Sequence, residues 1–167
     1  MSQKTIPYDL RTASTTPRFP LGTVVTTDTG ETYVYVRVFG SGATTNAPAY
    51  ASAGAGSSIT RSKWVVTPTS ADGKLPVGYF VGSPADGSYA WIKIRGEVTL
   101  TNNGTSGAGP GVAVYFVKTA GNAPQHVTGI NPPSSGVSTV IGFLLDTVTP
   151  NGSGRVWISL PFVKQER

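Results

Sequence analysis

Cysteine is missing from all 167 residues of this chain. Its absence excludes a disulfide framework, thiolate chemistry and zinc sites built on cysteine. Metal sites built from carboxylates stay open, and the redox compartment is not indicated.

Charge, helix-forming patterns and long apolar runs are also scarce. Charged residues make up 13% of the chain, against roughly 25% in an average soluble domain. No long window shows the 3.6-residue apolar period of a helix, and 21 glycines and 13 prolines disfavour one. No run approaches about 18 apolar residues, and no apolar segment follows the first residues, so we expect neither a membrane span nor a signal peptide. The composition predicts an all-β protein with long irregular loops.

The net charge is +5, from 13 basic and 8 acidic residues. The basic residues are scattered singly, whereas a nucleic-acid interface needs a clustered basic footprint. We therefore expect no nucleic-acid partner. A mild positive balance also suits contact with an acidic protein surface.

One phrase occurs three times: an apolar residue, a glycine, an apolar strand, a turn, then an alternating strand led by an aromatic residue. The copies begin at Leu21-Gly22, Val77-Gly78 and Ile141-Gly142, and their return strands begin at Tyr35, Trp91 and Trp157. The offset from the first copy to the second is 56 residues at both the glycine and the aromatic. From the second to the third it is 64 at the glycine and 66 at the aromatic. We interpret the copies as structurally equivalent hairpins, the alternative being chance similarity among glycine-rich β hairpins.

These hairpins, at 21–40, 77–96 and 141–162, predict an antiparallel β-sandwich or a partly open, jelly-roll-like β-barrel. The stretches 40–58 and 119–140 are interpreted as mostly loop. We expect one β domain over residues 21–167, preceded by an extended, proline-containing arm over residues 1–20. Either the arm is a disordered tail or it is ordered against a partner.

Alternation gives each return strand two faces. Val34, Val36 and Val38 of the first copy and Ile92 and Ile94 of the second are predicted to face the core. The opposite face is aromatic and cationic, which fits either cross-strand aromatic pairing or a contact surface for protein or, less well, carbohydrate. The candidate partner contacts are this face and the cations of the arm: Lys4, Arg11, Arg18, Tyr33, Tyr35, Arg37, Tyr89, Trp91, Lys93, Arg95 and Trp157.

Catalytic groups are few. His126 is the one histidine, and we interpret it as an exposed loop residue because no Gly-x-Ser-x-Gly elbow accompanies it. A glycosidase-type pair among Glu31, Glu97 and Asp146 is open but is selected by no motif. We therefore predict a protein that is not an enzyme, with no catalytic, cofactor-binding or metal-binding residues.

The chain resembles the small capsid decoration (cement) proteins of tailed bacteriophages. The residues that carry this resemblance are the segments 21–36, 77–96, 141–144 and 156–161. It implies a virion protein, made in the host cytoplasm, that binds the outer surface of the assembled capsid as a homotrimer and ties major capsid protein subunits together. The resemblance brings no catalytic residue. The alternative function is a phage tail or baseplate adhesin, or a carbohydrate-binding β module.

Overall fold

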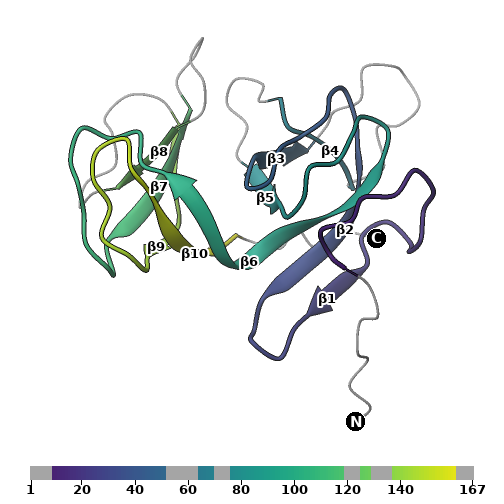
Figure 1. Ribbon diagram of the computed structural model, residues 1–167, viewed down its shortest axis with the longest axis horizontal. Coiled ribbons are helices and arrows are strands. Elements are labelled where there is room, and N and C mark those ends of the chain that lie inside the picture. Colours follow the sequence, from purple (N-terminus) through teal and green to yellow (C-terminus); the bar gives the residue numbers. More distant parts are fainter. Residues whose placement is uncertain (1–8, 52–63, 70–75, 119–124, 129–136, 161–167) are drawn as a thin grey trace.

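The computed structural model describes residues 9–51, 64–69, 76–118, 125–128 and 137–160. All regular structure in these residues is β, in ten strands (Figure 1). The all-β prediction is confirmed: five strands close into a barrel, and the strands packed outside it include a second, barrel-like set whose ends are joined by a single bridge. The strands are β1 (Val24–Thr26), β2 (Thr32–Val38), β3 (Pro48–Ala51), β4 (Val65–Thr67), β5 (Pro76–Phe80), β6 (Tyr89–Thr101), β7 (Ala113–Lys118), β8 (Gln125–Thr128), β9 (Val137–Leu144) and β10 (Ser153–Ser159).

Five strands close into a first barrel, which we call barrel 1. Their order is β2-β4-β3-β5-β6, and pairing of β6 with β2 closes the ring. Only β2 and β4 run parallel within it. The core of barrel 1 is aliphatic and includes the predicted inward residues of both return strands: Val34, Val36, Val38, Ile92 and Ile94. The prediction of which face of these strands forms the core is confirmed.

A second set of five strands, barrel 2, continues from the same β6 in the order β6-β10-β9-β7-β8. A single parallel bridge between Asn102, directly after β6, and His126 of β8 links the two ends of this set. Its interior is a separate apolar cluster that includes Leu100, Phe116 and Ile158. In Figure 1 the two barrels lie side by side, and β6 crosses from one to the other.

The two barrels have the same topology. In chain order β2 to β6 of barrel 1 correspond to β6 to β10 of barrel 2, and every pairing has the same direction. The register repeats as well. Pro48 and Ala49 pair with Tyr79 and Gly78, then the register shifts. Ala113 and Val114 pair with Phe143 and Gly142, and the register shifts at the same place.

The threefold phrase of the sequence is therefore structurally equivalent, as predicted: its copies form β1–β2, β5–β6 and β9–β10. The return strand of the middle copy, β6, belongs to both barrels. The phrase glycines occupy tight positions, since a Cβ at Gly78 would meet Ile92 and one at Gly142 would collide with the Trp157 carbonyl oxygen. Gly22 has φ +81° and lies against the Trp64 indole. Close packing accounts for the glycine in all three copies.

Two expected loops contain strands. β3 lies within 40–58, where small residues gave no alternation, and β8 lies within 119–140. Residues 52–58 of the first loop lie outside the described residues. A strand of four residues, as both of these are, offers too few positions to reveal a period.

The contact between the barrels is aromatic and contains the one histidine. Tyr50 and Tyr79 of barrel 1 are fully buried and join the apolar cluster of barrel 2. The ring centroid of Tyr50 lies 6.0 Å from that of Phe116, and the Tyr79 hydroxyl shares a 3.0 Å hydrogen bond with His126 Nε2. The interpretation of His126 as an exposed loop residue is wrong, because it lies in β8 with its ring largely buried. Burial lowers the pKa of His126 to about 4.

We predict that His126 makes the stability of the fold depend on pH between about 4 and 6.5. An unfolded chain binds the histidine proton near pH 6.5, whereas the folded chain excludes it down to about pH 4. Because the unfolded state binds more protons in this window, the free energy of unfolding falls as the pH falls, by on the order of 3 kcal/mol in all. Urea titrations of the wild type and His126→Gln at pH 7 and pH 4 measure this. The variant, whose side chain does not titrate, should lose less stability, and equal losses in both proteins would contradict the assignment.

Candidate functional site

A hollow of about 950 Å³ lies where β6 and β10 meet the N-terminal segment and the β1–β2 turn. Aromatic, amide and charged side chains share its wall. Among them are Arg11, Glu31, Asn46, Lys93, Glu97 and Trp157.

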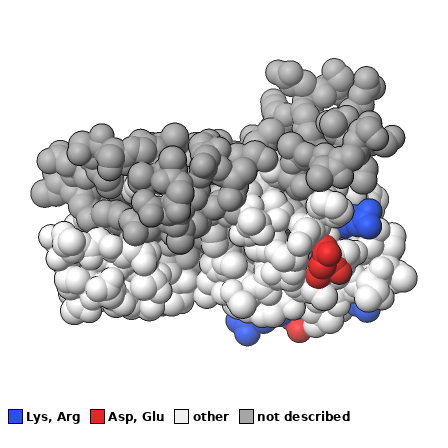
Figure 2. Space-filling model, turned by 90° about the horizontal axis from the view of Figure 1, so that it is seen from above, with Lys and Arg blue, Asp and Glu red and all other residues white. Residues whose placement is uncertain are grey.

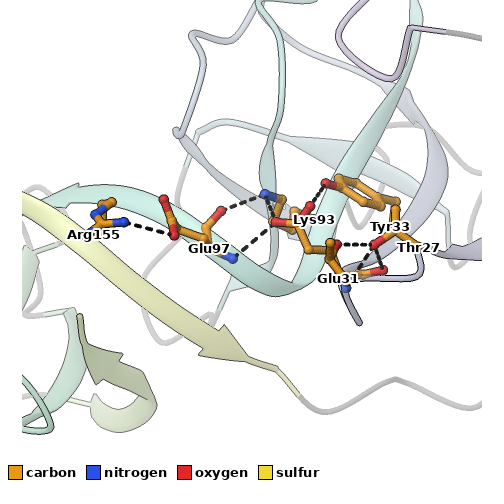
Figure 3. Close-up of polar contacts among 7 residues, drawn as sticks. Thr27, Glu31, Tyr33, Lys93, Glu97 and Arg155 are labelled. Atoms are coloured by element: carbon orange, nitrogen blue, oxygen red, sulfur yellow. Dashed lines mark hydrogen bonds and ion pairs between the residues drawn. The ribbon is translucent and has the colours of Figure 1, made fainter.

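A charged network forms part of the wall (Figure 3). Lys93 Nζ donates to Glu31 Oε1 at 2.8 Å and to the Glu97 carbonyl oxygen at 2.6 Å. The Tyr33 hydroxyl donates to Glu31 Oε2 at 2.7 Å. The amide of Glu31 in turn donates to Thr27 Oγ1 at 3.1 Å. The carboxylate of Glu31 thereby joins the start of β2 to the middle of β6.

The environment of Glu31 keeps it ionised. Partial burial alone raises the pKa of Glu31, but hydrogen bonds from Lys93 and Tyr33, together with the Lys93 charge, outweigh it and hold the pKa below its ordinary value. Burial, and then the hydrogen bond to Glu31, raises the pKa of the Tyr33 hydroxyl. At neutral pH Glu31 is therefore an anion, not the protonated acid that a glycosidase needs as proton donor.

The other two acids of the considered glycosidase pair are held by Arg155. Its guanidinium forms a bidentate contact with Asp146, at 2.9 Å from Nε and 2.7 Å from Nη2. It also lies 3.5 Å from Glu97 Oε2. The structure thus brings Glu31 and Glu97 to one place, as the sequence allowed, but engages each carboxylate in a different ion pair.

The predicted aromatic contact face is covered by the chain itself. Tyr33, Tyr35 and Trp91 are each at most 5% exposed and form a third apolar cluster. Phe19 packs on this cluster, 5.3 Å from Tyr35 and 5.4 Å from Trp91 between ring centroids. The three residues therefore do not offer a partner an exposed surface. They form cross-strand aromatic pairs, which is the alternative interpretation of this face. The apolar residues of the N-terminal segment bury this side of β2 and β6.

The N-terminal segment is attached by hydrogen bonds as well. Ser14 and Tyr89 exchange two backbone hydrogen bonds, of 2.9 and 2.7 Å. The amide of Arg18 donates to the Tyr35 hydroxyl at 3.1 Å. Residues 9–20 of the predicted arm thus lie along barrel 1 of the same chain.

The remaining candidate contacts are dispersed. Arg11, Lys93 and Trp157 meet at the hollow, where Trp157 is half-buried. Arg18 and Arg95 are exposed elsewhere, and Lys4 lies outside the described residues. Tyr89 and Arg37 are half-buried, with Tyr89 stacked 6.2 Å from Tyr35 and the Cα atoms of Arg37 and Tyr89 paired across the strands.

Two exposed apolar residues were missed from the sequence. Val140 and Phe143, both on β9, are 54% and 46% exposed. The sequence does place an aromatic residue at the same point of two copies, since Phe143 follows the phrase glycine as Tyr79 does in the second copy. Alternation alone did not reveal them because the third copy reads as a nearly continuous apolar run.

We predict that Glu31→Gln lowers the free energy of unfolding by about 1–3 kcal/mol, because it leaves Lys93, whose side chain is 11% exposed, without its counter-charge. Glu97→Gln is the matched control. The Glu97 side chain is 43% exposed and its partner Arg155 keeps Asp146, so its cost should stay below about 1 kcal/mol. Urea unfolding at neutral pH gives both values. Equal costs would contradict the assigned role of Glu31.

The parts of the chain that the structure describes contain no group of three or more His, Asp or Glu side chains placed to hold a metal ion. They also contain no helix long and apolar enough to span a membrane. Comparison of the chain with protein-family models, with curated proteins and with solved structures found no match.

Proposed function

We propose that this chain is a non-enzymatic structural protein of a virion that binds the outer surface of the assembled capsid. One observation carries the proposal. The segments that resemble capsid decoration proteins are the three hairpins β1–β2, β5–β6 and β9–β10, which supply β2, β5 and β6 of barrel 1 and β6, β9 and β10 of barrel 2. The resemblance therefore involves the framework of the fold, not isolated strands.

The charged groups of the hollow support a binding role over catalysis. Glu31 and Lys93 neutralise each other, and Glu97 and Asp146 share Arg155. A general acid or base needs a pKa near the working pH, whereas Glu31 has a pKa below its ordinary value. These groups fix the relation between the β1–β2 turn, β6 and β10, which is what a rigid binding scaffold requires.

The face seen in Figure 2 is unevenly charged: the visible basic and acidic side chains lie over the half occupied by barrel 1, and the described surface at the far left shows none. On barrel 2, Arg155 of β10 is paired with Asp146. Arg11, Arg18 and Arg95 are exposed on or beside barrel 1. We assign the capsid contact to these cations, which suit an acidic protein surface.

Bridging supplies the stabilisation. Major capsid protein subunits form a composite surface only in the assembled shell, so a protein that binds this surface favours assembly by mass action. Three copies in a homotrimer would join several weak contacts into a strong one. The homotrimer belongs to this proposal.

Glycan binding is the second candidate, favoured by the hollow alone. Sugars bind through aromatic stacking together with amide and carboxylate hydrogen bonds, and the hollow places Trp157 near Asn46 and Arg11. Trp91 is too deeply buried to take this part. Trp157 is therefore the residue whose replacement by Ala would abolish glycan binding.

We predict that the protein co-sediments with expanded capsids of its own virus and not with free major capsid subunits. The triple variant Arg11→Glu, Arg18→Glu, Arg95→Glu should bind at least about tenfold more weakly, and added salt should weaken the wild type. Asp28→Lys, which reverses an exposed charge in the β1–β2 turn, is the control and should bind like the wild type. Absence of capsid binding, together with a glycan affinity that Trp157→Ala removes, would replace this proposal with the second candidate.

A further inference from the structure

The internal repeat places two equivalent faces in different surroundings. On barrel 1 the outer face of β3 and β5 carries Tyr50 and Tyr79, which barrel 2 buries completely. The shared register makes Tyr115 the equivalent of Tyr50, and Phe143 the equivalent of Tyr79. On barrel 2 this face is open to solvent. We call it the β7–β9 face and define it by Tyr115, Val140 and Phe143.

The β7–β9 face is apolar and unusually exposed. Val140 and Phe143 are 54% and 46% exposed, and Tyr115 is half-buried. Tyr115 pairs directly with Val140, and Phe143 pairs with Trp157 of β10. Directly paired residues share one side of a sheet, so the four side chains form a continuous apolar strip. Grouped apolar side chains of this kind mark interaction surfaces more often than single ones do.

We propose that the β7–β9 face docks against a second copy of this chain, in the way that the Tyr50–Tyr79 face docks against barrel 2 within one chain. The occupant follows from the repeat. The chain already contains one face of this register, and a barrel of its own kind covers that face. The aromatic residues are retained at both sites: Tyr50 and Tyr115 are identical, and Tyr79 is matched by Phe143.

Geometry makes this contact head to tail. Within the chain, the outer face of barrel 1 meets the barrel that follows it in sequence. The β7–β9 face belongs to barrel 2, and no barrel of the described residues covers it, since Val140 and Phe143 are exposed. A barrel of a second copy takes that position, using a surface different from the β7–β9 face. Such heterologous contacts close into a ring when the rotation between copies allows it.

Chemistry distinguishes the second copy from a charged partner. The described residues of the β7–β9 face carry no ionised side chain, and the equivalent contact inside the chain is aromatic, with one neutral histidine. The free energy of this contact comes from apolar burial, so it should resist salt. The cation-mediated capsid contact proposed above should instead weaken as salt is added. The inference stands on the repeat alone and does not depend on capsid binding.

Sedimentation velocity of the free, full-length protein over a wide concentration range tests the proposal. The wild type should show a mass that rises with concentration above that of the 17.3 kDa chain and that persists in high salt. The double variant Val140→Asp, Phe143→Asp should dissociate at least about tenfold more readily, as expected when charge enters an apolar contact. Val24→Asp, at an equally exposed valine (43%) on β1, is the control and should associate like the wild type.

A second measurement covers the case in which the double variant fails to fold. The chain has no cysteine, so Phe143→Cys introduces a single thiol, and its alkylation should slow as the protein concentration rises. A wild type that stays monomeric at every concentration, or an alkylation rate independent of concentration, overturns the proposal. A monomeric wild type whose double variant loses capsid binding also overturns it and assigns the face to the capsid.

Discussion

Strand β6 is the constraint on which the two barrels depend. Its first half pairs with β2 and β5, and its second half pairs with β10. Near its middle, at Gly96, φ is +124° and a Cβ would press on the Glu31 side chain, so glycine suits the point at which β6 passes from barrel 1 to barrel 2. Just before this point Thr32 pairs with Arg95 while Tyr33 pairs with Lys93, so Ile94 is an extra residue in β6.

The shared strand explains where polar and apolar groups are placed. Lys93 and Glu97 of β6 lie on the side that meets the β1–β2 turn, and Glu31 joins them to it. At the junction between the barrels, Tyr79 and His126 are in contact through their rings and through one hydrogen bond. These groups serve the scaffold, and the partner contacts that we propose lie elsewhere, at the exposed arginines of barrel 1 and on the β7–β9 face of barrel 2.

Much of the scaffold could be predicted from the sequence, because it follows from local alternation. Val34, Val36 and Ile92 face a core as their spacing indicates, and the repeated phrase identifies the three hairpins. What failed depends on contacts distant in sequence. Nothing in the proline-containing segment around Phe19 indicates that it covers Trp91, and nothing near His126 indicates a buried strand. The exposure of Phe143 could not be predicted from its own strand, because the equivalence of Phe143 and Tyr79 follows from the register of their pairing with β7 and β3.

Native-state hydrogen exchange along β6 tests the central claim most directly. If one strand holds both barrels in a single cooperative unit, the hydrogen-bonded amides on either side of Gly96 open with the same free energy, and that value matches global unfolding. Amides before and after Gly96 that open at clearly different free energies would show two barrels unfolding independently. That result would contradict the account.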